Sequence, residues 1–374
     1  ANGSATSSCA NLQLEEDLEL CEAEDIIKTQ IVALRKREIT LAEEADALRI
    51  EKLIYIRNLK RLNSEQSSRF HKRPVLNNRY LLRCLLGKGG FSEVWRAYDL
   101  LMLRDVAVKI HETNPNWSEQ KKEVYLKHAT REYKIHLNLV HPRIVSLYEV
   151  FEIDGHSFAT VLEHCEGPDL ELYLKKNKCL PEKEARSILL QILSGLRYLS
   201  SGGNLKTNDT TGRRDQRPCI IHYDLKPANI LFSGPGEVKI TDFGLSKIME
   251  PVDTESTGIE LTSQFAGTYW YLPPECFRMG GRPPKISNKV DVWSTGVIFY
   301  QLLFGQRPFG EGMTQDSILQ HNTMLNATQV NFPQRPQVSD EAKSFIQKCL
   351  TYSQTLRPDV SSISSDPYIT KKIK

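Results

Sequence analysis

Hydrophobic residues recur every seven positions near the start of the chain. From Leu12 to Asn63 the sequence contains no glycine or proline, and glutamate, lysine, arginine, leucine and alanine dominate. We call one unbroken apolar series the heptad seam: Leu20, Ile27, Leu34, Leu41, Leu48, Tyr55 and Leu62. An apolar repeat sustained over about six heptads predicts a coiled-coil helix across residues 12–63.

The companion positions of this repeat are half polar: Glu24, Ile31, Glu38, Ala45, Lys52 and Leu59. A long helix cannot bury its apolar stripe against itself, so we expect a partner helix and favour self-association. A solitary charged helix, or one folded back on the rest of the chain, stays open as an alternative. The small polar residues 1–11 are expected to be disordered, and residues 64–75, which include Pro74, to form a linker.

After Pro74 the pattern changes from strands to helices. Short β-rich runs such as "DVAVKIHE" and "SFATVLEHC" come first, and helical segments such as "PEKEARSILLQILSGLRYLS" follow Pro168. This order predicts an α+β domain over residues 76–370, with a β-rich lobe (76–163), a hinge (163–167) and a helical lobe (168–370). The chemistry is expected between the lobes. A polar run at 201–219 predicts a surface loop, with partner binding as the alternative.

Composition adds few constraints. The chain has 374 residues, 25% of them charged, and a formal net charge of +3, so nothing global favours nucleic acid or a membrane as partner. No apolar run reaches membrane-spanning length. The eight cysteines form no C-x-x-C pair, which argues against a zinc site or a disulfide framework and favours reduced thiols in the cytosol or nucleus. Because the chain begins at Ala1, we interpret it as a piece of a longer protein.

The first chemical motif is a glycine-rich turn, "LGKGGFSEV". Gly87, Lys88 and Gly89 form a turn whose backbone N–H groups can approach phosphate oxygens closely, although glycine turns also occur for purely steric reasons. Next, "VAVK" places Lys109 on a strand, where its ammonium can hold nucleotide phosphates. Glu132, on a later helical segment, is the candidate counter-charge. Taken singly, each charge is equally compatible with a solvated surface.

Two further motifs, "HYDLKPANIL" and "ITDFGLS", supply the remaining chemistry. Asp224 is placed to accept the proton of a substrate hydroxyl, and Lys226 to steady the transferring phosphoryl group. Asn229 and Asp242 are candidate magnesium ligands. The segment "GTYWYLPPE" then ends in Glu275. The order and spacing of these motifs, rather than any one of them, predict a phosphotransferase that uses ATP and Mg²⁺.

Over about residues 76–370 the sequence resembles the eukaryotic protein kinases, and within them the tousled-like serine/threonine kinases. The resemblance is carried by "IIHYDLKPANIL", "EVKITDFGLSKIM", "LTSQFAGTYWYLPPECF" and "PPKISNKVDVWSTGVIF", and by a coiled coil ahead of the catalytic domain. It implies a bilobal kinase fold and a serine or threonine acceptor. It also implies a nuclear enzyme linked to chromatin assembly, with the anti-silencing histone chaperone as its protein substrate.

The resemblance also implies roles for residues around the nucleotide. Leu162 would be the gatekeeper, and the backbone of Glu163 to Cys165 would receive the adenine. Val94 and Ala107 would cover the adenine from above.

Two further residues are implied to be structural. Asp291 would anchor the backbone of the catalytic loop, and Arg357 would pair with Glu275.

Two departures from the general protein-kinase pattern stand out, and the tyrosine is one that the tousled-like kinases share. Ser92 replaces the third glycine of the turn. Tyr223 replaces an arginine that binds an activation-segment phosphate in many kinases, and a tyrosine cannot form that charge-assisted pair. The five polar groups assigned to the chemistry are all present: Lys109, Glu132, Asp224, Asn229 and Asp242.

We therefore predict an active kinase whose regulation differs. The alternatives are a kinase-shaped scaffold without activity and a coiled-coil structural protein with an incidental nucleotide-binding domain. Coiled-coil association would promote autophosphorylation in trans, at hydroxyls between Asp242 and Glu275. The candidates are Ser246, Thr254, Ser256, Thr257, Thr262 and Ser263.

Overall fold

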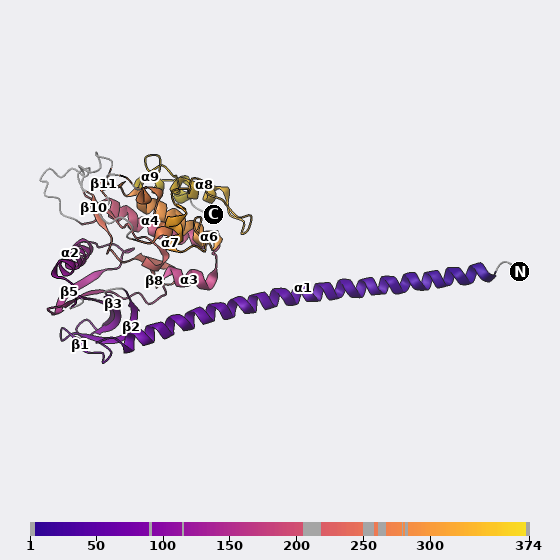
Figure 1. Cartoon of the computed structure of the whole chain (residues 1–374), viewed down its shortest axis with the longest axis horizontal. Helices are drawn as coiled ribbons and strands as arrows, with labels where there is room; N and C mark the ends of the chain where they lie inside the picture. The colour runs from indigo at the N-terminus through magenta and orange to yellow at the C-terminus, as the bar shows by residue number, and fades with distance from the viewer. Residues whose placement is uncertain are drawn as a thin grey trace. The chain divides into compact units, whose positions relative to one another are not determined.

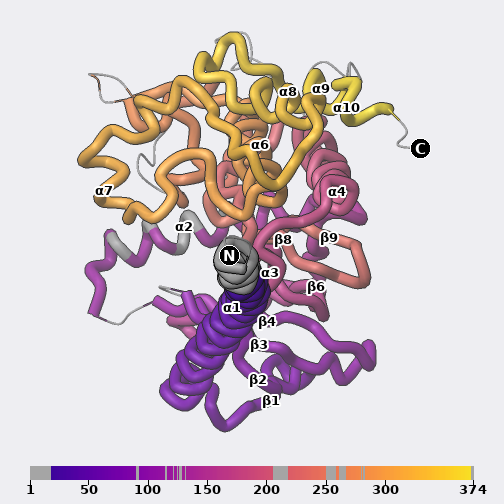
Figure 2. The backbone as a smooth tube through the Cα atoms, turned by 90° about the vertical axis from the view of Figure 1, so that its right-hand side faces the viewer, coloured from indigo at the N-terminus to yellow at the C-terminus, as the bar shows by residue number. Residues whose placement is uncertain are grey.

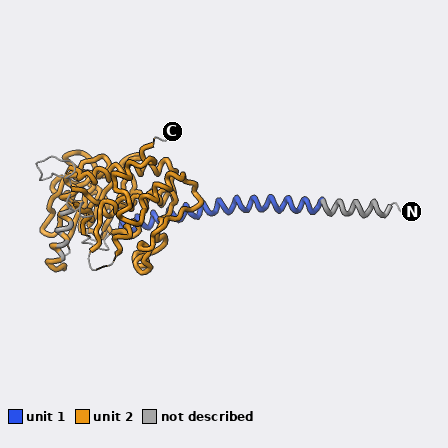
Figure 3. The backbone as a smooth tube through the Cα atoms, turned by 90° about the horizontal axis from the view of Figure 1, so that it is seen from above, with its two compact units in different colours: residues 1–62 blue, residues 63–374 orange. Residues whose placement is uncertain are grey.

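The chain divides into two units, Ala1–Leu62 and Asn63–Lys374, which are coloured separately in Figure 3. The computed structural model describes residues 4–89, 92–113, 116–204, 218–249, 258–260, 267–278, 280 and 283–371, with residues 4–17 and six α2 positions described as backbone only. Within these ranges, no helix combines the length and the apolar character needed to span a membrane.

The first unit is one continuous helix, α1 (Ser4–Gln66), whose last residues belong to the second unit (Figure 1). The helix begins earlier than expected, so most of the segment predicted as disordered is helical. Nothing between Ser4 and Leu12 breaks a helix, since the sequence has neither glycine nor proline there. Every residue of the heptad seam is exposed, from 46% for Leu62 to 68% for Leu34.

Helix α1 also runs past the expected boundary and ends within the predicted linker. The Ser67 hydroxyl bonds the carbonyl of Ser64 at 3.0 Å, a local bond that competes with further helix. The Ser68 hydroxyl donates to Glu93 at 2.6 Å, and the Glu65 carboxylate accepts from the backbone N–H of Leu85 at 3.0 Å. Within the second unit, the end of α1 is therefore fixed to the sheet.

A six-stranded antiparallel sheet follows, in the order β1-β2-β3-β4-β6-β5. Its strands are β1 (Val75–Leu76), β2 (Tyr80–Lys88), β3 (Ser92–Asp99), β4 (Arg104–Glu112), β5 (Leu147–Asp154) and β6 (Ser157–Glu163). One helix, α2 (Glu119–His136), connects β4 to β5. The side chains of β3 alternate between buried and half-buried, as expected for a sheet with one face on a core.

The core of this lobe lies on one face of the sheet. Trp95, Leu85, Val108 and Val161 come from four different strands and are fully buried. Each such side chain contributes about 1.5–3 kcal/mol through burial. Because side chains alternate, the residues between them, such as Val94, face the opposite side, where the second lobe lies.

The second lobe is mainly helical. Its helices are α3 (Leu170–Asn177), α4 (Glu182–Ser200), α6 (Lys289–Phe304), α7 (Gln315–Gln320), α8 (Asp340–Cys349), α9 (Val360–Ser364) and α10 (Pro367–Thr370), with short 3₁₀ turns η2 (Pro227–Asn229), η3 (Tyr269–Tyr271) and η4 (Pro274–Phe277). Three two-stranded ribbons pair β7 (Cys219–Ile221) with β10 (Lys247–Met249), β8 (Ile230–Gly234) with β9 (Glu237–Ile240), and β11 (Ile259–Glu260) with β12 (Lys285–Ile286).

Helix α6 is the centre of this lobe. It is apolar on nearly every side and almost entirely buried, as a helix surrounded by others must be. It ends at Gly305, whose φ of 71° suits the left-handed cap. Figure 2 shows the β-rich and helical lobes of this unit as separate layers, with β8 and β9 between them. The predicted bilobal α+β architecture is confirmed.

Candidate active site

The β-rich lobe contributes a lysine held between two carboxylates. Lys109 Nζ lies 2.5 Å from Glu132 Oε1 and 3.2 Å from Asp242 Oδ1. Strand β4 presents the lysine, α2 the glutamate, and the segment after β9 the aspartate. The predicted partnership of Lys109 and Glu132 is thus formed, and Lys109 also touches the predicted magnesium ligand.

Electrostatics within this group favour its charged forms, except at Glu132. Burial alone would lower the pKa of Lys109, but the charges of Asp242 and Glu132 raise it overall. The charge of Lys109 lowers the pKa of Asp242 to about 2, against the effect of burial. Burial raises the pKa of Glu132, although Lys109 opposes this. Asp242 therefore stays ionised at neutral pH, with its side chain 44% exposed.

The helical lobe contributes the catalytic loop. Asp224 Oδ2 accepts from Lys226 Nζ at 2.6 Å, and Lys226 Nζ also donates to Thr268 Oγ1 at 2.9 Å. The Asn229 amide donates to the backbone carbonyl of Asp224 at 2.8 Å. Because this bond uses the amide nitrogen, the amide oxygen of Asn229 is the atom left to ligate a cation.

The loop backbone is fixed from below by a buried carboxylate. Asp291, on α6, accepts from the backbone N–H of His222 at 2.8 Å and from that of Tyr223 at 2.9 Å. Tyr223 and Asp242 both have positive φ, 71° and 65°. Such strained non-glycine residues persist where surrounding contacts over-determine the backbone, and they cluster at functional sites.

Three aromatic rings connect α2 to the catalytic loop. Phe243 lies 4.7 Å from the ring of His136 and 5.2 Å from that of His222, between centroids. His136 Nε2 also contacts the carbonyl of Val145 at 2.6 Å, and burial lowers the pKa of His136 to about 4. The neutral ring is thus favoured. The two histidine rings hold Phe243 in place, and because Asp242 directly precedes Phe243, they also help to keep Asp242 beside Lys109.

Among the nucleotide-side residues, Gly87, Lys88 and Gly89 lie at the end of β2. The backbone N–H of Gly89 donates to the carbonyl of Ser92 at 2.7 Å. Lys88 Nζ bonds Glu93 at 2.9 Å, so its ammonium is already paired. Residues 90 and 91, the tip of the turn, lie outside the described residues.

Val94 and Ala107 lie on neighbouring strands above the site. Val94 pairs with Lys109 in the β3–β4 register, and Ala107 pairs with Leu162 in the β4–β6 register. The two predicted adenine-covering residues therefore share the sheet neighbourhood of Lys109 and of the predicted gatekeeper.

The hinge carries a contact that the sequence analysis did not predict. Glu163 Oε1 lies 2.5 Å from Lys239 Nζ on β9, and Glu163 Oε2 accepts from the backbone N–H of Ser146 at 3.1 Å. The side chain thus links the hinge to both lobes. Cys165, two residues on, is partly buried, and burial raises the pKa of its thiol to about 11.

Several other residues were predicted with less detail or not at all. Arg357 pairs with Glu275 in a buried bidentate contact, at 2.8 and 3.1 Å, as expected from the resemblance. Thr268 also contacts the catalytic loop, since its backbone N–H and its hydroxyl both donate to Asp224 Oδ1 at 3.2 Å. His136 was missed, although its position four residues after Glu132 puts both on one helix face.

Part of the regulatory prediction falls outside the described residues. Of the candidate phosphorylation sites, Ser246 is buried, and its hydroxyl donates to the carbonyl of His222 at 3.2 Å. Thr254, Ser256, Thr257, Thr262 and Ser263 lie outside the described residues, as do 205–217 of the predicted surface loop.

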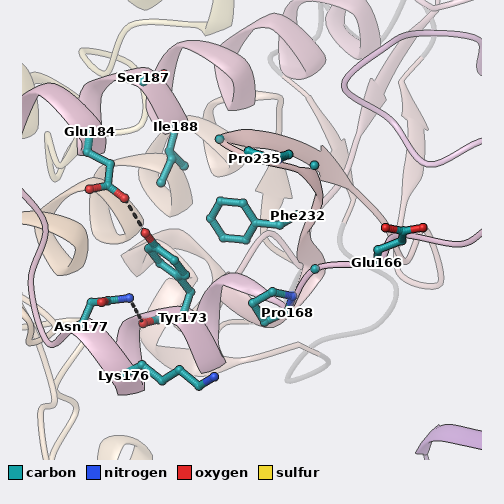
Figure 4. Close-up of a pocket in the computed structure, with 13 residues that line it drawn as sticks. Glu166, Pro168, Tyr173, Lys176, Asn177, Glu184, Ser187, Ile188, Phe232 and Pro235 are labelled. Carbon is teal, nitrogen blue, oxygen red and sulfur yellow. Dashed lines mark hydrogen bonds between the residues drawn. The ribbon is translucent and has the colours of Figure 1, made fainter.

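A cavity of about 630 Å³ lies below the hinge, between α3, α4 and the β8–β9 turn (Figure 4). Tyr173 and Phe232 face one another within it, with ring centroids 4.8 Å apart. The Tyr173 hydroxyl donates to Glu184 at 2.6 Å. None of the residues assigned to phosphoryl transfer lines this cavity, so it is separate from the candidate active site.

Comparison with known proteins agrees with this geometry. The family described as "Protein kinase domain" matches residues 80–369. Serine/threonine-protein kinase tousled-like 2 of Xenopus tropicalis is 54% identical over 357 residues, covering 94% of this chain and 49% of that protein. Its human counterpart is also 54% identical, covering 94% and 44%. Serine/threonine-protein kinase TOUSLED of Arabidopsis thaliana is 50% identical over 369 residues, covering 98% and 50%.

The chain thus spans about half the length of these relatives. The match includes both lobes and extends into the helix that precedes them. With its lysine–glutamate pair, catalytic loop and activation segment in the expected order, the chain belongs to the protein kinase family, and within it to the tousled-like serine/threonine kinases.

Proposed function

We propose that this chain is an active kinase that transfers the γ-phosphate of ATP to serine or threonine hydroxyls of proteins. The observation that supports it best is the contact between Asp224, Lys226 and Thr268, alongside a formed Lys109–Glu132 pair. A scaffold without activity would not need these groups in register.

Each group has a distinct role in this proposal. Asp224 orients the substrate hydroxyl and takes its proton as the oxygen bonds to the γ-phosphorus and the bond to the leaving diphosphate breaks. Lys226, held by Asp224 and Thr268, steadies the phosphoryl oxygens. Lys109 positions the nucleotide phosphates, and Glu132 fixes Lys109. Most of the rate gain comes from positioning and electrostatics.

The metal-binding residues suit magnesium. Asp242 offers an ionised carboxylate and Asn229 an amide oxygen, both hard oxygen ligands of the kind Mg²⁺ prefers. When bound there, magnesium would neutralise charge on the β- and γ-phosphates.

The test is transfer of labelled γ-phosphate from ATP to a generic protein acceptor. We expect transfer by the wild type, dependence on magnesium, and loss in Asp224→Asn. Asp340→Asn, whose side chain is 97% exposed in its contact with Lys343, is the matched control and should behave as wild type. Nucleotide binding without transfer by the wild type would instead favour the scaffold.

We further propose that the chain self-associates through α1 and that association promotes autophosphorylation in trans. The support is the exposure of every heptad-seam residue, which a partner helix would cover. Leu34→Asp with Leu41→Asp should lower the mass seen in sedimentation and slow autophosphorylation at low concentration. Lys36→Asp, off the seam, is the control. An unchanged mass in the double variant would contradict the proposal.

Substrate and location are proposed from the resemblance alone. The anti-silencing histone chaperone would be the substrate, in a nuclear enzyme linked to chromatin assembly. The chaperone should be phosphorylated with a higher kcat/KM than a generic acceptor at equal concentration. Equal values for the two acceptors would argue against this substrate, and exclusion of the tagged longer protein from nuclei would argue against the location.

A further inference from the structure

Tyr223 is a buried residue of the catalytic loop itself. Its side chain is 1% exposed, and its backbone N–H is bonded to Asp291. Its hydroxyl lies beside the thiol of Cys276 but has no hydrogen-bond partner of normal geometry among the described residues. The hydroxyl therefore does not account for the position of this residue, and the aromatic ring must be considered.

The face of the ring meets a buried lysine. Lys247 is 5% exposed, and its Nζ lies 5.5 Å from the centroid of the Tyr223 ring. This distance falls within the range of cation–π attraction, which strengthens when the cation is removed from water. Burial, with a contribution from Cys276, raises the pKa of Tyr223 well above its usual range, so the hydroxyl stays protonated and the ring uncharged.

Lys247 belongs to the activation segment, by which we mean the chain from Asp242 to Glu275. It is the first residue of β10, which pairs with β7 so that Lys247 lies opposite Ile221. Strand β7 leads directly into His222 and Tyr223, and Lys247 follows Asp242 by five positions. The contact between ring and ammonium thus connects the catalytic loop to the segment that carries a magnesium ligand.

An arginine at position 223 would change this contact. A guanidinium at that place would repel the ammonium of Lys247, whereas the face of an aromatic ring attracts it.

We propose that Tyr223 is a positioning residue that holds β10 on the catalytic loop through the contact of its ring with Lys247. The contact supports Asp224, which follows Tyr223 in the loop, and Asp242, which lies on the same segment as Lys247. This inference rests on the proposed kinase activity and adds a residue that positions its groups.

The test distinguishes the effect of the aromatic ring and of the lysine charge from the effect of simply filling the space. Tyr223→Leu and Lys247→Met remove the ring and the charge, whereas Tyr223→Phe and Lys247→Arg keep them. In phosphatase-treated protein, we expect kcat about tenfold lower in the first two, with KM for ATP unchanged, and values close to wild type in the conservative pair. Lys175→Met, on α3 with its side chain half exposed, is the control.

The double variant gives a sharper test, because it shows whether the two side chains act through the same contact. If ring and ammonium act through one contact, Tyr223→Leu combined with Lys247→Met should be no slower than either single variant. The proposal is overturned if the losses of kcat in the two single variants add fully in the double variant. It is also overturned if Tyr223→Phe loses as much kcat as Tyr223→Leu, or if Lys247→Met keeps the wild-type kcat.

Hydrogen exchange provides a readout that does not depend on activity. The amides of Lys247, Ile248 and Met249 should exchange faster in Tyr223→Leu, while amides of α6 stay protected. If the wild type is inactive but β10 exchanges faster in Tyr223→Leu, the kinase proposal is refuted and the contact stands. If the wild type is active but β10 exchanges equally fast in wild type and Tyr223→Leu, the contact alone is refuted.

Discussion

His136 predicts a specific loss of stability in acid. Its ring is 3% exposed, contacts the carbonyl of Val145 at 2.6 Å and lies against Phe243. Burial lowers its pKa to about 4; the bond to Val145 and the charge of Asp242 oppose that effect, and the charge of Lys109 reinforces it. In the unfolded chain the pKa of histidine is about 6.5.

The sign follows from proton uptake. Between pH 6.5 and 4 the unfolded chain binds the proton and the folded chain does not, so the free energy of unfolding falls as the pH falls. The contribution of His136 is fully present above pH 6.5. At pH 5, about 1.5 pH units below the unfolded pKa, the loss is about 2 kcal/mol at ~1.36 kcal/mol per unit.

The assay is urea unfolding at pH 7 and pH 5, followed by tryptophan fluorescence. Wild type should lose about 2 kcal/mol more between the two pH values than His136→Leu does. His111 is also buried, and burial lowers its pKa to about 3, but it is present in both proteins and cancels from this difference. His321→Leu, at an exposed position, should lose as much as wild type.

The outcome that would refute this reasoning is an equal loss in wild type and His136→Leu. That result would mean that the folded state accepts a proton at position 136 as easily as the unfolded chain does. The lower stability expected for His136→Leu at both pH values does not affect the comparison, because only the change with pH is used.

Three further predictions test the site and the core. Arg357→Met leaves the carboxylate of Glu275 buried without its partner and should lower the free energy of unfolding by about 3–5 kcal/mol in chemical denaturation. Gly296→Ala places a Cβ 2.6 Å from a side-chain atom of α8 and should lower the melting temperature, whereas Gly155→Ala, with open space around it, should not. Lys109→Met should reduce kcat/KM for ATP by about a hundredfold or more in steady-state kinetics, and an unchanged value would remove Lys109 from the nucleotide site.

The catalytic loop was predictable because its groups are close in sequence. Asp224, Lys226 and Asn229 lie within six residues, so their spacing alone restricts their geometry. The contact between Lys109 and Asp242 joins residues separated by 133 positions, and the sequence analysis did not predict it.

Other features were not predictable from local pattern. The contact of Glu163 with Lys239 joins two ordinary surface-type residues, and the ring contact of Tyr223 with Lys247 depends on the pairing of β7 with β10. The start of α1 was misplaced because small polar residues favour neither helix nor coil strongly, and the repeat that signals the helix begins later. In each case tertiary contacts or helix propagation, rather than residue type, decide the outcome.

The hinge thiol has a consequence for chemical probes. The sequence analysis predicts that the backbone of Cys165 receives adenine, so a ligand designed for that site could carry an electrophile toward this residue. Yet a thiol with a pKa of about 11 is ionised in only about one molecule in ten thousand at pH 7, and the thiolate is the reacting species. Covalent ligands for this site should therefore depend on long residence rather than on intrinsic thiol reactivity, and labelling should accelerate steeply as the pH is raised.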